Sequence, residues 1–251
     1  MLTGVYSRKL ALLIAAVGVG ASTLGAAVTN ADMMQTFELS NFNAGDASNP
    51  LDATITFDFS VAAKNLTITI DNTTPSTYSA GELIRSVGFS LASVTAPASL
   101  NNVAMVGDER TVAGNGSFTD SAELVNARLT SPWTFNPNGG GYTLSAAGSK
   151  DLVIGPANAN SQYSGNGSID GNHGHNPFLT SGASFTINLP GITPGSEVAG
   201  NNIVVGYGTS CLTASAPLTF TSSSAPEPAT LGMLAVGGVG LLLGRRKTSK
   251  A

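Results

Sequence analysis

Two histidines and an aspartate lie close together and are the first residues whose types suit metal binding. The stretch NGSIDGNHGHNPF contains Asp170, His173 and His175, and the two histidines are the only ones in the chain. Imidazole and carboxylate groups bind metals, and the neighbouring glycines would let the backbone fold around an ion. The spacing fits neither a zinc motif nor a calcium loop. We therefore expect an exposed turn leading into Pro177, with no metal and no cofactor, and keep a metal site as the alternative.

Residues that could act as nucleophiles lack the sequence context that catalysis needs. Cys211 is the only cysteine, and no local signature supplies it with a base, so a small buried side chain on a strand is expected. No Gly-x-Ser-x-Gly elbow occurs. The acids are scattered singly, which leaves a paired-carboxylate glycosidase open, because such pairs meet in space rather than in sequence. We expect a protein that is not an enzyme.

Two other features could contact a ligand through a surface. Trp133, the only tryptophan, lies in the loop-like stretch TSPWTFNPNGGG and could stack on a sugar or anchor the edge of the fold. Thr54, Thr56, Thr67 and Thr69 alternate with apolar residues, so they should form an outward ladder. Such a ladder could match ice or a crystalline polysaccharide, although threonine is also a common strand residue on solvent-facing surfaces.

The elements that would position these residues are short strands. In DATITFDFS, residues Ile55, Phe57 and Phe59 alternate with polar residues, as in a strand with one buried face. NLTITID repeats the alternation, and the four residues VAAK between the two stretches predict an antiparallel hairpin.

The sequence predicts further strands and one helix in the body. Asp120 would cap the helix, and Pro132 would end it. Charged residues make up only 10% of the chain, and Gly, Pro, Asn and Ser clusters separate the strands as turns. The pattern predicts an all-β fold, an antiparallel β-sandwich or jelly roll. The additional strands are expected in RSVGFSLAS, NNVAMVG, GYTLSAA, KDLVIG, SFTINLPG, NIVVGYGT and PLTFTSS.

The body is acidic. Residues 32–225 contain five Lys and Arg against fourteen Asp and Glu, a net charge of about −9. Such a surface repels polyphosphate. We therefore expect no nucleic-acid partner.

The first 31 residues have the pattern of a signal peptide. Arg8 and Lys9 precede an apolar core, and the small residues that follow end at Ala31, where signal peptidase should cleave after export through the Sec translocon. Cleavage at Ala27 and a retained membrane anchor are the alternatives. The apolar core is shorter than the ~20 residues of a spanning helix, which favours cleavage.

The last 26 residues form a three-part tail. Pro226-Glu227-Pro228 comes first and should hold an extended conformation that a protease cleft can accept. Residues 229–244 are uncharged and as a helix would measure about 24 Å, a short membrane span. Arg245, Arg246 and Lys247 follow and should stop the chain on the cytoplasmic side.

This order of proline motif, short span and basic end resembles the PEP-CTERM sorting signal of exosortase-dependent surface proteins of Gram-negative bacteria. The resemblance covers about the last 25 residues. It implies transient anchoring in the inner membrane, recognition of Pro226-Glu227-Pro228 by an exosortase, and delivery to the cell surface or matrix. A plain C-terminal anchor is the alternative.

The predicted organisation is a signal peptide (1–31), a β-sandwich body (32–220), a linker (221–225) and the sorting tail (226–251). We expect a structural or adhesive surface protein, with extracellular polysaccharide as a further partner. The alternative is a surface module that binds glycan or ice.

Overall fold

The computed structural model describes residues 32–43, 50–94, 103–121, 133–163, 169, 174–200 and 203–208, and the backbone of 219–224. Among these residues the structure is built from strands, and the one-turn 3-10 helix η1 (Ala80–Glu82) is the only helix. The prediction of an all-β fold is confirmed. Residues Met33–Ser224 form one compact unit.

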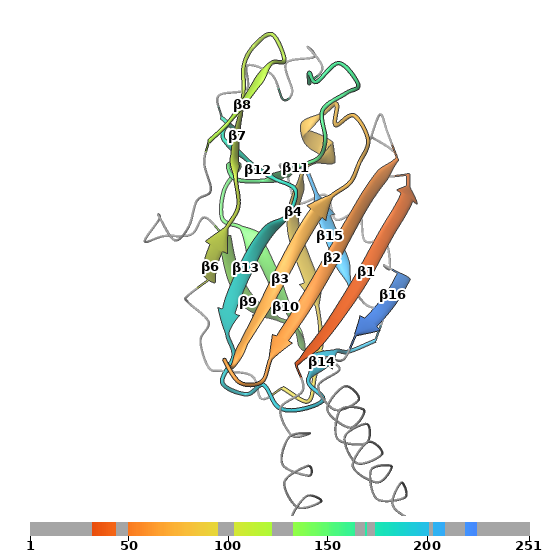
Figure 1. Ribbon diagram of the computed structural model, residues 1–251, viewed down its shortest axis with the longest axis vertical. Coiled ribbons are helices and arrows are strands. Elements are labelled where there is room, and N and C mark those ends of the chain that lie inside the picture. Colours follow the sequence, from red (N-terminus) through yellow and green to blue (C-terminus); the bar gives the residue numbers. More distant parts are fainter. Residues whose placement is uncertain are drawn as a thin grey trace, which may run out of the picture. The chain divides into compact units, whose positions relative to one another are not determined.

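Six strands form the first sheet, in the order β16-β1-β2-β3-β13-β6. Each neighbouring pair is antiparallel. Figure 1 shows β1, β2, β3 and β13 side by side across the front of the body. The strands are β1 (Met33–Phe42), β2 (Leu51–Ser60), β3 (Asn65–Asn72), β6 (Val103–Val106), β13 (Ala183–Asn188) and β16 (Thr219–Ser224).

The second sheet has the order β8-β7-β12-β11-β4-β10-β9, with β15 also paired to β4. Its ladders are antiparallel except that between β11 and β12, which is parallel. Two short strands, β5 (Leu91–Ala92) and β14 (Glu197–Val198), pair separately. The strands of the second sheet are β4 (Ile84–Phe89), β7 (Glu109–Val112), β8 (Phe118–Asp120), β9 (Trp133–Asn138), β10 (Gly141–Ala146), β11 (Val153–Ile154), β12 (Phe178–Thr180) and β15 (Val204–Tyr207).

The core lies between the two sheets. Along β2 every second side chain is buried, as the alternation in the sequence predicts. Aromatic rings connect the layers: Phe57 of the first sheet meets Phe89 of the second at a centroid distance of 4.8 Å. These contacts make the body a β-sandwich, in agreement with the prediction.

Two hairpins show how the sequence sets strand register. The β2–β3 hairpin is confirmed, with Ser60 opposite Asn65 across the VAAK turn. In the β9–β10 hairpin, Gly139 and Gly140 have φ angles of 56° and 98°. Both central positions of the favoured two-residue hairpin turn require positive φ, which glycine adopts without steric cost.

Two sequence predictions about elements need correction or fall outside the described residues, and one strand was missed. The predicted linker 221–225 is wrong for most of its length, because β16 continues to Ser224, whose backbone pairs with Met34 of β1. Strand β1 itself was not predicted. The helix expected after Asp120 lies in residues 122–132, outside the described part, and Asp120 ends β8.

Candidate functional sites

The residues predicted to direct export and sorting lie outside the described part of the chain. They are Ala31, Pro226, Glu227, Pro228, Arg245, Arg246 and Lys247. Within the described ranges, no helix is long and apolar enough to cross a membrane.

The predicted metal candidates are described only in part. Asp170 and His173 lie outside the described residues. His175 is half-buried, and its Nδ1 lies 2.8 Å from the carbonyl oxygen of Ser149, so Nδ1 carries the proton and donates it. Among the residues that the structure describes, no three His, Cys, Asp or Glu side chains group together as a metal site would require.

Trp133 is a core residue on the edge strand β9, so the sugar-stacking alternative is wrong. Its side chain is 1% exposed on β9. The indole Nε1 donates to the carbonyl of Asp151 at 2.8 Å, and the ring lies 4.6 Å from that of Phe185 in the other sheet. No ring face is left for a sugar, because the alternation of β9 directs Trp133 inward.

The predicted threonines do face outward, and three of them, Thr56, Thr67 and Thr69, are part of a wider hydroxyl ladder on the first sheet. Thr36, Thr56, Thr69 and Ser184 lie opposite one another on four neighbouring strands. Hydrogen bonds join Thr36 to Thr56 at 3.2 Å and Thr69 to Ser184 at 3.0 Å. A second row pairs Thr67 with Thr186 at 3.2 Å. We call these six residues the hydroxyl ladder.

Acidic residues flank the hydroxyl ladder. Asp58 lies opposite Thr67, and Asp71 lies opposite Thr54. Partial burial raises the pKa of Asp71, and the backbone hydrogen bond from Gly182 opposes this rise. None of the strands β1, β2, β3, β6 and β13 contains Lys or Arg, so this face is negative.

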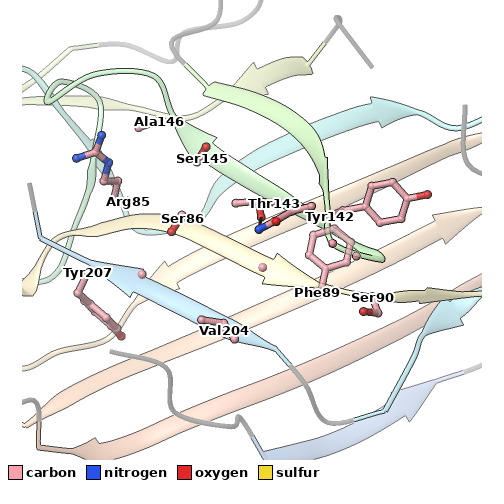
Figure 2. Close-up of a pocket in the computed structure, with 15 residues that line it drawn as sticks. Arg85, Ser86, Phe89, Ser90, Tyr142, Thr143, Ser145, Ala146, Val204 and Tyr207 are labelled. Atoms are coloured by element: carbon pink, nitrogen blue, oxygen red, sulfur yellow. Dashed lines mark hydrogen bonds between the residues drawn. The ribbon is translucent and has the colours of Figure 1, made fainter. Parts of the chain in front are cut away.

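A groove of about 480 Å³ lies on the second sheet, along the central strand β4 between β10 and β15 (Figure 2). Register places Thr143, Gly88 and Val204 in one row across these three strands. The next row contains Ser145, Ser86 and Gly206. Because paired residues share a face, the glycines leave the backbone as the groove floor.

One end of the groove carries a positive charge, and the other end is lined by aromatic residues. Arg85 lies at one end, and Phe89, Tyr142 and Ser90 lie at the other (Figure 2). Burial raises the pKa of Tyr142, and burial is also the main reason that the pKa of Tyr207 is raised. Both phenols are therefore neutral at neutral pH, and Arg85 gives the lining its positive charge.

Sequence reasoning missed this groove. The sequence feature that could have indicated the groove is glycine within strand patterns, because such a glycine marks a bulge or a site of close approach. A Cβ atom at position 206 would lie 2.1 Å from the Ser86 hydroxyl, and one at Gly141 would lie 2.6 Å from the Phe89 carbonyl oxygen. The contact at Gly141 is with backbone, so close packing requires this glycine, whereas the Ser86 hydroxyl could move away from a Cβ at position 206. A Cβ at Gly88 would meet nothing nearer than 3.7 Å.

Comparison with known proteins identifies the C-terminal segment. Residues 224–247 match the family model of the PEP-CTERM protein-sorting motif. The chain carries a PEP-CTERM motif. The match spans the proline tripeptide, the uncharged run and the basic residues Arg245, Arg246 and Lys247. The chain matches no curated protein and no solved structure.

The PEP-CTERM motif implies export and membrane-associated processing by an exosortase. Its first residue, Ser224, is also the last residue of β16. Along the chain, the sorting signal therefore follows the last strand of the sandwich without a spacer.

Proposed function

We propose that this protein is a cell-surface or matrix protein whose β-sandwich body serves adhesion or structure and carries out no catalysis. The observation that carries the proposal is the PEP-CTERM motif joined directly to a self-contained sandwich. In this proposal the N-terminal leader starts export through the Sec translocon, signal peptidase removes it, and the tail holds the chain transiently in the inner membrane. The final location is the cell surface or the extracellular matrix.

The sandwich has features that suit this role. Its first sheet presents a polar face of hydroxyl and carboxylate groups, which remains well hydrated outside the cell. Its last strand is held against β1 by backbone pairing, so the body keeps its C-terminal strand in place where the tail begins.

Replacing Pro226-Glu227-Pro228 with three alanines tests the sorting part of the proposal. We expect the altered chain to accumulate in the inner-membrane fraction with its tail uncleaved, while the unaltered chain is released. Replacing Thr248 and Ser249 with alanine, outside the matched residues, is the control and should leave release unchanged. Normal release of the triple-alanine chain would contradict exosortase-dependent sorting.

A surface module that binds ice or crystalline polysaccharide is the second candidate function, and the hydroxyl ladder favours it. Neighbouring strands repeat at about 4.8 Å and alternate residues at about 6.7 Å, which gives the hydroxyls a regular grid. The double variant Thr56→Val, Thr69→Val removes two hydroxyls at nearly constant shape. Thermal hysteresis or cellulose pull-down should fall with this variant, and a null result with the folded wild-type protein would reject this candidate.

A further inference from the structure

We infer that the end of β16, residues Ser222–Ser224, is part of the segment that the exosortase binds, and that β1 competes with the enzyme for it. The tail is then removed only after these three residues leave β1. This inference deepens the proposed function and rests on it, because it adds residues to the sorting step and names the contact that controls that step.

The sorting motif and the last strand share a residue. Strand β16 ends at Ser224, and the family match begins there. Only Ala225 separates Ser224 from Pro226. An enzyme cleft that accepts several residues of extended chain before the proline tripeptide therefore takes in the end of β16.

The backbone of the tripeptide offers few hydrogen-bond donors. A protein that holds a peptide as an extended strand gains affinity mainly from main-chain hydrogen bonds. Proline has no N–H, so Glu227 is the only backbone donor in Pro226-Glu227-Pro228. The next donors on the C-terminal side belong to residues 229–244, the predicted membrane span. Recognition outside the span therefore draws on Ala225 and the end of β16.

Strand β1 already pairs with this segment. Residues Ser222–Ser224 lie opposite Met34, Gln35 and Thr36 in antiparallel register. A protease cleft encloses its substrate from both sides, so a segment that remains in the sheet does not enter it. Pairing with β1 and binding to the enzyme therefore exclude each other.

A β-bulge separates this end of β16 from the rest of the strand. Thr36 of β1 lies opposite Ser222. The next residue of β1, Phe37, lies opposite Phe220, so Thr221 is an extra residue. A bulge interrupts the hydrogen-bond ladder, and strand ends open at a lower free energy than the whole fold. The three end pairs can thus open while the remaining pairs hold β16 on the sandwich.

The test changes the β1–β16 pairing from outside the tail. Met34 is exposed, lies opposite Ser224 and is far in sequence from the sorting motif. Met34→Gly weakens the strand, and Met34→Ile strengthens it. In cells that contain the exosortase, the pulse-labelled full chain should lose its tail about 5-fold faster with glycine than with isoleucine, the factor that corresponds to their difference in strand preference. The shift in chain size on a gel measures the rate.

Ala104 provides the matched control. It is exposed on β6, at the other edge of the same sheet. Ala104→Gly and Ala104→Ile therefore change strand preference without altering the β1–β16 pairing, and both chains should lose the tail at the wild-type rate. Equal effects at positions 34 and 104 would show that overall stability sets the rate, and this result would overturn the inference.

A second copy of residues 222–225, inserted before Pro226, gives the enzyme an unpaired segment of unchanged sequence. Tail removal should then be faster than in the wild-type chain and should no longer depend on the residue at position 34. A wild-type rate, or a rate that still depends on position 34, would overturn the inference. The triple-alanine chain keeps the two claims apart. Tail removal that persists in it contradicts sorting, whereas tail removal that stops in it but ignores position 34 contradicts only this inference.

Discussion

At the residue scale, a buried polar cluster connects the two sheets near Gly155. Asn72 of β3 donates from Nδ2 to the carbonyls of Glu82 and Val153, at 2.8 and 3.0 Å. Its Oδ1 accepts the backbone N–H of Thr74 at 3.2 Å. Because a buried amide is costly unless it is hydrogen-bonded, this arrangement fixes how β3 meets β11.

The atoms of this cluster leave no room for a side chain at position 155. A Cβ there would lie 2.4 Å from the Thr77 hydroxyl and 3.0 Å from the Thr74 carbonyl oxygen. Gly155→Ala should lower the free energy of unfolding by about 1–3 kcal/mol through overpacking, measured by urea denaturation. Gly148→Ala is the matched control, since its Cβ would meet nothing within 4 Å, and it should change stability by less than about 0.5 kcal/mol. Equal effects would contradict the steric explanation.

The Arg110–Asp120 pair should give stability a dependence on pH. The hydrogen bond from Arg110 lowers the pKa of Asp120 below its usual value. Its stabilising effect is therefore present above the ordinary carboxyl pKa of about 3.9 and is lost as pH falls through the folded-state pKa. Asp120→Asn should cost about 0.5–1 kcal/mol at pH 7 because Asp120 is partly exposed, and this cost should shrink in acid.

Denaturation midpoints of the wild-type and Asp120→Asn proteins at pH 7 and pH 3 measure this change. Glu38→Gln, an exposed acid on β1, serves as the control. A cost for Asp120→Asn that is the same at both pH values would show that the ion pair is not its source.

At the element scale, strands were predictable where side-chain alternation was complete. It was complete in β2 and β3 and incomplete in β1, because the inward Gln35 breaks the apolar pattern and instead accepts the backbone N–H of Val198 at 2.6 Å. Strand β9 resembles a loop in sequence because it contains Pro137, which is tolerated because β9 is an edge strand. Strand β16 was predicted in PLTFTSS, but its end was placed too early because its last three residues are serines, which resemble a linker.

The two candidate sites also differ in whether they could be predicted from the sequence. The outward threonines of the hydroxyl ladder were predictable from a period of two within two adjacent strands. The groove was not, because it depends on small residues at Gly88, Thr143 and Gly206, which only the register of three strands distant in the sequence brings together.

The β9–β10 turn provides a prediction for one element. Gly140→Ala should cost about 1–2 kcal/mol, because its φ of 98° disfavours any residue with a Cβ. Gly139→Asn should be nearly neutral, since asparagine is common at the first position of this turn. Thermal unfolding followed by circular dichroism measures both, and a larger loss from Gly139→Asn would contradict the assigned turn geometry.

At the scale of the whole molecule, the body begins and ends on neighbouring strands. Met34 pairs with Ser224, and the ladder continues to the pair of Glu38 with Thr219. The strand β16 therefore belongs to the folded unit, although the sequence had placed a linker at residues 221–225.

Two truncated chains test this boundary. Residues 33–224 should unfold in one cooperative transition, because the described core lies within this unit. Residues 33–218 lack β16 and should unfold at lower denaturant and associate, because one edge of β1 is then unpaired. Equal stability of the two chains would show that β16 is dispensable.

In the proposed export route, the pairing of β1 with β16 would set an order of events. If the chain crosses the membrane from its N-terminus, β1 would emerge first and would lack its β16 partner until the intervening residues had crossed. The outer edge of β1 would close only when Ser224 arrives, and Ser224 is where the sorting motif begins. We would therefore expect the first sheet to be completed as the sorting signal arrives, and a chain that stops early to be left with an unpaired strand.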